Sequence, residues 1–419
     1  MKKNENKEQK IKNLKKELKT KNEFWYNQDK NLRIRHYELL EFLESKGFYK
    51  SVNGRDIKML RIANNIIEEI NEVQIGDYVI EHLNQINEDE VKEVFIKGIS
   101  HYGSKKFLSA LKSLDLDYPK DTKENAIFYF KNKVVDVGCE VIKVQDYASL
   151  SYPIAKDMII NYNYKESSKG ISDFETFIYN ISKKDDARFE SLKSVIGYLL
   201  HNHQDPSNAK AVIFTDENIS GDKTANGGVG KSLIHNAIAK LRNVVTLDGK
   251  NLKNGSKFFF QQVNRSTNII CFDDVHKTFD FETLYSSITS GIVVEKKFET
   301  EYTIPFDQTP KIIISSNYSV VGTGGNSENR RRIDFEIANY YNDKLTPISE
   351  FGKRFFDDWN EEEWSAFYKF MFDCLKLYLE KGVIEAKPIN LNKSRLVQET
   401  SSEFYEFMNL NVKYNEWID

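Results

Sequence analysis

One short stretch, residues 225–232, constrains the fold of this chain more than any other. It reads Ala-Asn-Gly-Gly-Val-Gly-Lys-Ser, follows an apolar run at 211–214 and precedes a helical pattern at 233–241. Strand, glycine-rich loop and helix in this order are typical of a loop that cradles phosphate with its backbone N–H groups. The helix N-terminus adds partial positive charge at the same place. The stretch predicts an α/β core that binds a nucleoside triphosphate. The simpler interpretation is a flexible turn ahead of Lys-Ser.

Each position of this loop has an expected role. Lys231 is predicted to reach the β- and γ-phosphates, and the Ser232 hydroxyl to hold Mg²⁺. The other loop positions are predicted to surround the phosphates with their backbone: Ala225, Asn226, Gly227, Gly228, Val229 and Gly230. The loop by itself indicates binding of a nucleotide and says nothing of what the nucleotide is used for.

Two later apolar strands end in polar side chains. The run 268–274 ends in two acids; we expect Asp273 to hold Mg²⁺, directly or through water, and Asp274 to orient or deprotonate the attacking water. The run 311–317 ends in Asn317, whose amide can touch both the γ-phosphate and that water. Carboxylates at the end of a buried strand lie at the carboxyl edge of a sheet, beside the phosphate loop. The simpler interpretations are an Asp-rich turn and an Asn that ends a strand as a turn former.

A basic hairpin is predicted between these two strands. Within residues 291–306, the β-branched runs suggest two short strands with Lys296, Lys297 and Phe298 near their connection. A cation beside a stacking ring is what contact with a single nucleic-acid strand requires. The alternative is a solvated hairpin with ordinary surface lysines.

Three consecutive arginines, Arg330, Arg331 and Arg332, stand ahead of an alternating strand. A guanidinium suits the charge that develops on a transferring phosphoryl group. Because the arginines come past the strand that ends in Asn317, we expect them to reach a neighbouring subunit's nucleotide more readily than their own. The alternative is an intramolecular salt-bridge cluster.

Composition excludes several classes of protein. The net charge of −3 over 419 residues is no global nucleic-acid signature, so any DNA contact must come from a local patch. Cys139, Cys271 and Cys374 match no metal or disulfide spacing, which favours a reducing cytoplasm. No stretch approaches about 18 continuous apolar residues, and the N-terminus has no hydrophobic core. Neither a membrane span nor a secretory signal is therefore expected.

The order of these elements resembles that of superfamily 3 helicases: phosphate loop, Asp-Asp strand, Lys-bearing hairpin, strand ending in Asn, then arginine. These are hexameric motors of the AAA+ group from viruses, phages and plasmids. The closer resemblance is to phage and mobile-element primase-helicases of the poxvirus type. Residues 197–200 look like the end of that group's helical collar domain, and 355–359 with 363–364 look like the tail of the phage branch. The resemblance covers roughly residues 120–380.

The resemblance implies a fold and a division of the chain. The fold is an α/β P-loop NTPase core of AAA+ type with helical N-terminal and collar domains and a helical C-terminal tail. The expected parts are a mostly helical region at 1–120, a small β-rich segment at 121–165, a helical collar or oligomerisation domain at 166–207, the ATPase core at 208–345 and a helical tail at 346–419. In the first part, residues 1–23 are predicted to be a frayed helix or disordered arm, and Ile66, Ile67 and Ile70 to share one helix face.

The resemblance also implies roles for matching positions, with ATP and Mg²⁺ as cofactors. Lys231 and Ser232 are expected to bind phosphate and Mg²⁺, Asp273 and Asp274 to form the acidic pair, and Asn317 to act as the sensor. Lys296 or Lys297 is expected to be the hairpin residue that faces DNA. The arginine finger is expected to be Arg331, with Arg330 and Arg332 as the next candidates. Three departures matter. Ala225 stands where the first glycine of the loop is expected. The second acid is Asp274 where Glu is common, and this shorter side chain predicts slow hydrolysis. No primase module is evident: Asp115-Leu-Asp117 reads as a turn, and His82 and His101 are isolated.

The expected function is that of an ATP-dependent replicative DNA helicase of a phage or mobile element, moving on single-stranded DNA as a ring in the bacterial host cytoplasm. The expected partners are single-stranded or forked DNA, further copies in a homohexamer, and a separate primase or origin-binding protein, with no membrane. A non-motor switch, in which NTP binding gates assembly on DNA or on a partner protein, is the main alternative. A small-molecule kinase fits less well, because neither the hairpin nor the Asn strand suggests an acceptor pocket. Replacing Lys296 and Lys297 discriminates the first two, since only a motor needs them for unwinding.

Overall fold

The chain folds into two compact units. The computed structural model describes residues 24–29, 31–53, 56–114, 120–217, 230–250, 259–297, 301–320, 322 and 325–411. The N-terminal unit comprises Met1–Pro119 and Tyr147–Lys156, and the core unit comprises Lys120–Asp146 and Asp157–Asp419. The predictions for residues 1–23, for Asp115–Asp117, for loop positions 225–229 and for Phe298 lie outside the described residues.

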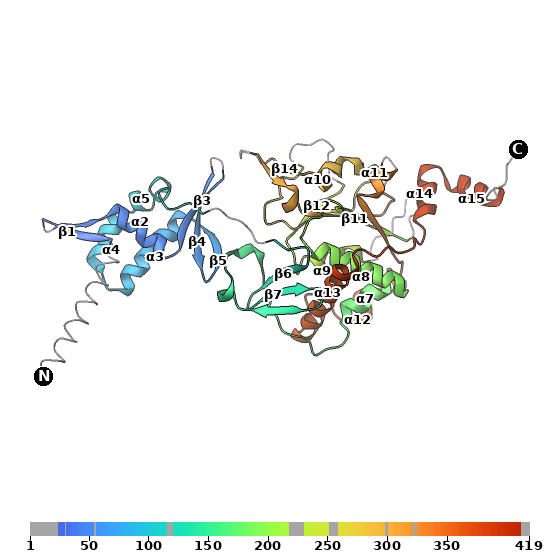
Figure 1. The fold of residues 1–419 in the computed structure, drawn as a ribbon, viewed down its shortest axis with the longest axis horizontal. Coiled ribbons are helices and arrows are strands. Elements are labelled where there is room, and N and C mark those ends of the chain that lie inside the picture. The colour runs from blue at the N-terminus through green and yellow to red at the C-terminus, as the bar shows by residue number, and fades with distance from the viewer. Residues whose placement is uncertain are drawn as a thin grey trace. The chain divides into compact units, whose positions relative to one another are not determined.

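The N-terminal unit combines a sheet with helices (Figure 1). Its four-stranded sheet has the order β3 (Phe48–Asn53), β4 (Asp56–Ala63), β5 (Ile66–Ile70) and β9 (Ile154–Ala155). A separate hairpin joins β1 (Trp25–Gln28) to β2 (Asn31–Ile34). The helices are α2 (His36–Ser45), α3 (Glu72–Gln85), α4 (Asp89–Lys97), α5 (Ile99–Tyr102) and α6 (Lys105–Leu108).

The expectation of a mostly helical region at 1–120 is wrong for the stretch that holds β3, β4 and β5. The three isoleucines assigned to a helix face lie in β5, antiparallel to β4. Asn64 and Asn65, between the two strands, have φ of +52° and +60°. Two central residues with positive φ make the tight turn whose twist matches a hairpin, and Asn tolerates that conformation. The Asn-Asn pair was the signal for a hairpin that the isoleucine spacing obscured.

A five-stranded parallel sheet forms the centre of the core unit. Its order is β12 (Val244–Asp248), β13 (Ile269–Asp273), β16 (Lys311–Ser316), β11 (Ala211–Asp216) and β17 (Arg332–Ile337). Every pair is parallel, so all five carboxyl ends lie at one edge. All residues of β11 and β16 are buried, as near-continuous apolar runs are in parallel sheets. The predicted α/β class with a parallel sheet and helices is confirmed.

Two layers cover this sheet (Figure 1). Helices α7 (Asp173–Ile181), α8 (Asp186–Leu200), α9 (Lys231–Ile238) and α13 (Glu361–Lys381) pack on one face. The 3₁₀ turn η3 (Phe281–Leu284), helix α10 (Tyr285–Thr289) and the hairpin β14 (Gly291–Val294)–β15 (Tyr302–Pro305) pack on the other. Residues alternate between the layers along β11: Val212 and Phe214 face the helices, whereas Ala211 and Ile213 face the hairpin.

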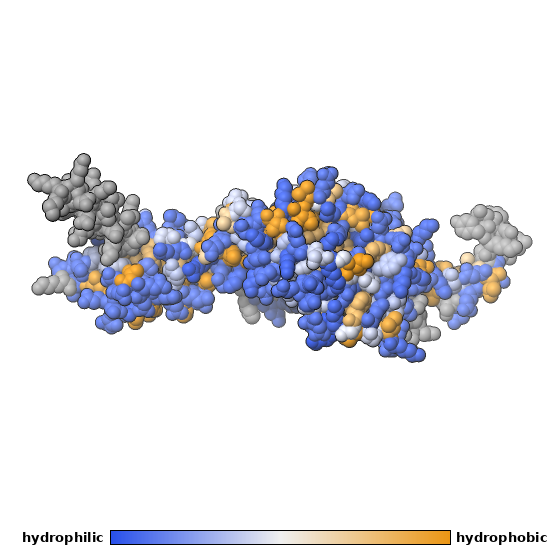
Figure 2. All heavy atoms as spheres, turned by 90° about the horizontal axis from the view of Figure 1, so that it is seen from below, coloured by the Kyte–Doolittle hydropathy of each residue, from blue (hydrophilic) through white to orange (hydrophobic). Residues whose placement is uncertain are grey.

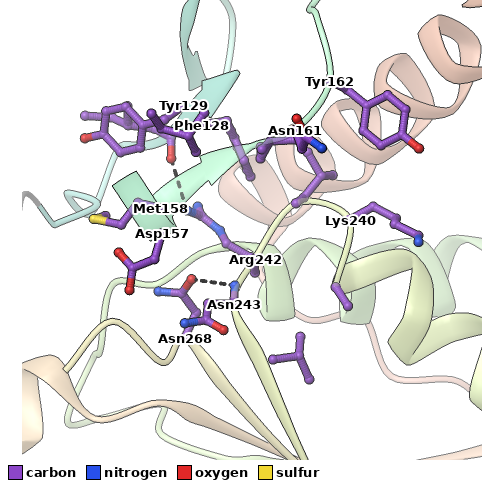
Figure 3. A pocket seen from close by; sticks show the side chains of 16 residues that line it. Phe128, Tyr129, Asp157, Met158, Asn161, Tyr162, Lys240, Arg242, Asn243 and Asn268 are labelled. Carbon is purple, nitrogen blue, oxygen red and sulfur yellow. Dashed lines mark hydrogen bonds between the residues drawn. The ribbon is translucent and has the colours of Figure 1, made fainter. Parts of the chain in front are cut away.

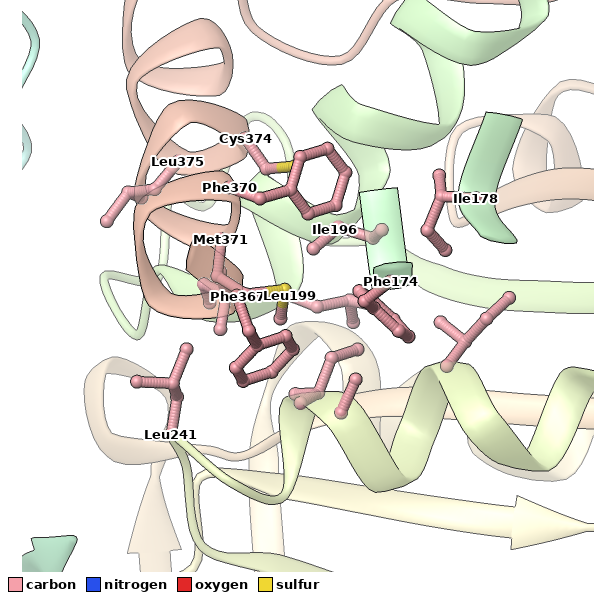
Figure 4. Close-up of a cluster of buried hydrophobic side chains, with 14 of the residues drawn as sticks. Phe174, Ile178, Ile196, Leu199, Leu241, Phe367, Phe370, Met371, Cys374 and Leu375 are labelled. Carbon is pink, nitrogen blue, oxygen red and sulfur yellow. The ribbon is translucent and has the colours of Figure 1, made fainter. Parts of the chain in front are cut away.

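The helical layer is held by aromatic and sulfur-bearing side chains (Figure 4). Phe367, Phe370 and Met371 of α13 pack with Phe174 of α7 in one buried cluster. Gly197 lets α8 approach α13 closely, because a Cβ there would overlap the carbonyl oxygen of Cys374. This close packing makes α8 and α13 a firm support for α9, which begins the candidate site.

Smaller elements complete the core unit. A sheet of order β10 (Ile159–Ile160), β6 (Asn125–Phe130), β7 (Val134–Gly138) and β8 (Ile142–Gln145) contains the short strands predicted at 126–147. The remaining helices are α11 (Asn326–Asn329), α12 (Pro347–Phe351), α14 (Leu391–Glu399) and α15 (Ser402–Asn411). Among the described residues, no helix has both the length and the apolar character needed to cross a bilayer. The face in Figure 2 is largely hydrophilic, with apolar residues in separate spots.

Candidate functional site

Polar side chains from three strands and one helix meet at the carboxyl edge of the parallel sheet. The Lys231 ammonium, at the start of α9, donates to Asp216 Oδ1 at 2.5 Å and to Asn317 Oδ1 at 2.7 Å. Asn317 in turn donates from Nδ2 to Asp274 Oδ1 at 2.8 Å. Of the residues predicted from sequence, the fold therefore brings Lys231, Asn317 and Asp274 into one hydrogen-bonded chain.

The two acids at the end of β13 are positioned by the neighbouring strand. Ser315 of β16 donates its hydroxyl to Asp273 Oδ1 at 2.5 Å and accepts the Asp274 N–H at 2.9 Å. Asp274 has a φ of +54°, an uncommon value for a residue with a side chain, and the two carboxylates have different partners. Lys250, just after β12, forms an ion pair with Asp274.

The start of α9 requires a glycine. Gly230 is the N-cap of α9 and has a φ of +107°, a region that side chains disfavour. A Cβ at this position would lie 2.6 Å from Phe177 Cζ of α7. Ser232 follows on the exposed side of the first turn, where the helix N-terminus contributes partial positive charge. α9 thus begins at this edge of the sheet, with Ser232 exposed in its first turn.

Burial shapes the electrostatics of the cluster. Burial raises the pKa of the Asp216 carboxyl; the Lys231 ammonium opposes this effect and the Asp274 carboxylate adds to it. Burial also lowers the pKa of His235, one turn along α9, against the opposing effect of Asp273. Lys231 therefore opposes the effect of burial on the pKa of Asp216, and a ligand that draws Lys231 away would leave burial and Asp274 to raise that pKa further.

The order of strands places this cluster where open α/β sheets bind ligands. The chain leaves β11 through α9 toward β12 on one side, whereas it leaves β16 toward β17 on the other side of β11. Adjacent strands whose connections depart in opposite directions form a crevice outside their carboxyl ends. Asp216 ends β11 and Asn317 follows β16, so the cluster lies at this switch point.

A hollow of about 490 Å³ lies along the outer side of α9. Five apolar residues line it, Leu233, Pro347, Ile348, Phe355 and Phe356, together with five polar or charged residues, Asn236, Lys240, Thr346, Arg354 and Asp357. The Lys240 ammonium lies 5.0 Å from the centroid of the Phe356 ring. Leu233 is two residues from Lys231 along α9, so the hollow begins within one turn of the start of this helix. Its size and mixed lining are those of pockets that hold small molecules.

A second hollow, of about 360 Å³, lies near the amino edge of the sheet (Figure 3). The buried Arg242 guanidinium beside it donates to Asp121 Oδ2 at 2.7 Å and to the Ile127 carbonyl at 3.0 Å. Asn243 and Asn268 are joined through a backbone N–H of Asn243 at 2.9 Å. Arg242 thus joins the small sheet to the core, and this hollow lies at the edge of the parallel sheet opposite Lys231.

The three predicted arginines differ in their surroundings. Arg332 is buried at the first position of β17, where it pairs with Glu328 and Asp334. Arg331 donates to the Ser327 hydroxyl at 2.7 Å, and Arg330 is exposed and has no ion pair within the described part of the chain. Because β17 runs parallel to β11, all three lie at the amino edge of the sheet, about 20 Å from Lys231 for a strand of this length. They do not reach the cluster of their own chain.

The predicted hairpin is present. β14 and β15 pair in antiparallel fashion from Gly291↔Pro305 to Val294↔Tyr302. Ile292 and Val294 pack into the core, which leaves the connection to carry Lys296, half-buried, and Lys297, exposed. The two lysines lie apart from the Lys231 cluster along the chain and in the layer on the other face of the sheet from α9.

Sequence reasoning missed several members of the cluster. Asp216, Ser315 and Lys250 all lie at or next to the carboxyl end of a strand of the same sheet. The apolar run taken as the first strand stopped at Phe214, two residues before its acidic end. A usable signal existed, because polar residues that end apolar strands in an α/β protein collect at one edge.

Comparisons with known proteins give weak structural likenesses only. No family model and no curated protein matches the chain. A solved structure described as the A form apo structure of NrS-1 C terminal region-CTR shares 14% identity at a TM-score of 0.44, over 87% of this chain and 74% of that one. The apo structure of the NrS-1 C terminal region (305-718) shares 13% identity at a TM-score of 0.44, over 90% and 82%. Similarity this low assigns the chain to no family.

Proposed function

We propose that this chain is an ATP-driven motor on single-stranded DNA, of the superfamily 3 helicase type, with its nucleotide at the carboxyl edge of the parallel sheet. One observation carries the proposal: Lys231 of the glycine-rich loop is linked through Asn317 to Asp274, at a switch point of the sheet. These are the groups that phosphoryl transfer needs, namely a cation for phosphate, an acid near the attacking water and a polar link between them.

In this proposal the phosphates exchange places with the present partners of Lys231. The ammonium leaves Asp216 and Asn317 for phosphate oxygens, assisted by the backbone of residues 225–230 at the head of α9. Ser232 and Asp273 supply the hydroxyl and carboxylate oxygens that Mg²⁺ prefers. The ion, when bound, neutralises charge on the phosphates. Asp274 accepts the proton of the attacking water or holds that water in line.

We place the nucleobase in the hollow beside α9. The hollow starts at Leu233, close to the phosphate end of the site, and continues toward Lys240. Its apolar walls at Pro347, Ile348 and Phe355 suit the faces of a purine, and the Asn236 amide suits its polar edge. A nucleotide bound in this way would lie along α9, with its base among the residues that follow β17 and its phosphates at the loop that precedes α9.

The arginine contribution comes, in this proposal, from a neighbouring copy. Arg330 and Arg331 lie too far from Lys231 of their own chain, so only a head-to-tail contact between copies brings them to a nucleotide. Such a heterologous contact closes into a ring when its rotation permits. Arg332 is the poorest of the three candidates, because Glu328, Asp334 and the Val320 carbonyl already take its donors.

DNA contact is assigned to the β14–β15 hairpin. Lys297 is exposed at its connection, and Lys296 precedes it. In a ring, six hairpins facing a channel would move with the nucleotide state of each site and draw the strand along. Neither origin recognition nor binding of a separate primase is assigned to these residues.

The first experiment measures ATP hydrolysis by the full chain with and without single-stranded DNA. We expect turnover to rise several-fold with DNA and to vanish in Lys231→Ala. Lys369→Ala, which removes an exposed lysine of α13 paired with Asp373, is the matched control and should turn over like the wild type. Turnover that ignores DNA would favour the alternative of an NTP-gated switch, and turnover that survives Lys231→Ala would refute the site.

A second experiment separates motor from switch. Lys296→Ala with Lys297→Ala should abolish unwinding of a forked duplex while basal ATP turnover persists. Unwinding at the wild-type rate by this variant would contradict the role of the hairpin. For the arginine, Arg331→Ala that kept full turnover in assembled rings would contradict its role in a neighbour's site.

A further inference from the structure

The β1–β2 hairpin of the N-terminal unit has one apolar face and one basic, aromatic face. Trp25, Leu32 and Ile34 pack with the core of the unit. Tyr26 stands directly opposite Arg33 in the antiparallel register, so both side chains lie on the other face. The Arg35 guanidinium lies 4.9 Å from the centroid of the Tyr26 ring, and Arg33 and Arg35 are exposed. A ring flanked by two exposed guanidinium groups is therefore held at the surface.

This face continues through a group of rings into α5 and α6. The His36 ring, directly after Arg35, lies 5.1 Å from the His101 ring and 5.8 Å from the Phe107 ring. His36 and His101 are exposed, as are Lys105 and Lys106, which directly precede Phe107. The end of the hairpin and α6 thus meet through His36 and Phe107, although they are far apart in sequence.

Charge is segregated within the unit. Residues 31–37 contain two arginines and no acid, and residues 98–114 contain three lysines and no acid. In contrast, residues 68–93 contain nine acids and one lysine. Arg35 forms an ion pair with Glu38, whose carboxylate lies 3.5 Å away with both side chains exposed. An exposed pair of this kind contributes little and leaves Arg35 able to take another anion.

We propose that this surface, made of Tyr26, Arg33, Arg35, His36, Lys105 and Lys106 and called the hairpin patch, binds single-stranded nucleic acid. Exposed cations follow a phosphate backbone, and an aromatic ring beside them offers a platform on which a base stacks. An acidic protein would match the charge but would not need the ring at Tyr26. The hairpin patch belongs to a different unit from Lys296 and Lys297 and does not depend on a nucleotide.

The test uses the full chain and a fluorescent thymidine oligomer of about 20 nucleotides, long enough for sites of this kind. Binding is followed by anisotropy without ATP, in a Lys296→Ala, Lys297→Ala background that removes the proposed core contact. We expect Arg35→Ala with Lys105→Ala and Lys106→Ala to weaken binding at least tenfold. Because each phosphate contact to a single strand contributes about 0.7 to the slope of log K against log salt, the slope should fall by about 2.

The matched control removes three lysines of the same unit that already pair with acids. Lys58 pairs with Glu69 at 2.9 Å, Lys92 with Asp89 at 2.5 Å and Lys97 with Glu93 at 3.3 Å. Replacing these three by alanine changes the net charge equally and should leave affinity and slope within a factor of about two. Equal losses in the two triple variants would overturn the proposal, because they would reflect net charge alone.

Substitutions at Tyr26 test the role of the aromatic ring without changing the net charge. Within the described residues the Tyr26 hydroxyl donates to Gln28 alone, at 3.4 Å, so Tyr26→Phe keeps the ring and its packing. We expect Tyr26→Phe to bind within about twofold of its parent and Tyr26→Leu to bind roughly tenfold more weakly, which is the usual contribution of one stacked base. Equal affinity for Phe and Leu, or binding of an acidic polypeptide in place of the oligomer, would overturn the assignment to nucleic acid. Circular dichroism melts establish that each variant is folded, and retained oligomer binding in Lys231→Ala separates this surface from the nucleotide site.

Discussion

Acidification should destabilise the core unit through one buried histidine, His201. It caps the C-terminus of α8 and is 2% exposed. Its Nε2 lies 2.7 Å from the Thr122 carbonyl oxygen, which makes Nε2–H the donor, and Nδ1 has no hydrogen-bond partner among the described residues. Burial lowers the pKa of His201 to about 4; the Lys311 ammonium adds to this effect and the Asp121 carboxylate opposes it. A proton on Nδ1 would thus be buried without an acceptor and close to another cation.

The magnitude follows from the two pKa values. In the unfolded chain the imidazole binds a proton below about pH 6.5, whereas in the folded chain it does so only near pH 4. Acid therefore favours the unfolded chain: the stability that neutral His201 contributes is complete above pH 6.5 and is lost as the pH falls toward 4. At 1.36 kcal/mol for each pKa unit, the full loss is roughly 3 kcal/mol.

Urea unfolding at several pH values tests this. Between pH 7 and pH 4.5 the wild type should lose roughly 2–3 kcal/mol more unfolding free energy than His201→Gln, whose amide can still donate to Thr122. His203→Gln, two residues along and half-buried, is the matched control and should follow the wild-type curve. Parallel pH profiles for the wild type and His201→Gln would refute the reasoning, because the loss would then belong to other groups.

Three further substitutions are expected to destabilise the core unit, each measured as a shift in its urea midpoint. Gly230→Ala should destabilise by about 1–3 kcal/mol, because it combines a positive φ with a clash against Phe177. Its effect should be larger than that of Gly352→Ala, where φ is positive but nothing lies near the added Cβ. Equal losses of stability in the two variants would contradict the clash. Arg332→Ala should destabilise by about 3 kcal/mol, because Glu328 would remain buried without its cation, whereas Asp334 would keep its ion pair with Arg395. A neutral result would mean that this arginine is free for another role. Gly197→Ala should destabilise by about 1–3 kcal/mol by forcing α8 away from α13, and a neutral result would contradict the close packing.

Much of the candidate site could be predicted from local pattern. Runs of apolar residues ending in Asp273 and Asn317 identified two strands of the parallel sheet, and polar residues at strand ends must share an edge. The β14–β15 hairpin followed from its β-branched runs. These features depend on residues close together in the chain, so the sequence displays them directly.

Other features depend on contacts between distant residues. Asp216 and Lys231 meet because α9 begins at the carboxyl end of β11, and Ser315 meets Asp273 because β16 lies beside β13. In the N-terminal unit, isoleucine spacing that fits a helix face was overridden by the Asn64–Asn65 turn.

The sequence by itself determined the order and kind of elements in the core unit, since periodicity and strand-ending residues act over short distances. Only the tertiary structure decided which polar groups share a partner. Strand order joins Lys231 to Asp216 and Asn317, and the same parallel order separates Arg330 and Arg331 from them by the length of a strand. Three arginines that look alike in sequence therefore differ in the fold: Arg332 is buried and paired with Glu328 and Asp334, whereas Arg330 is exposed. The physical reason is that burial makes pairing obligatory, and only the folded chain determines what is buried.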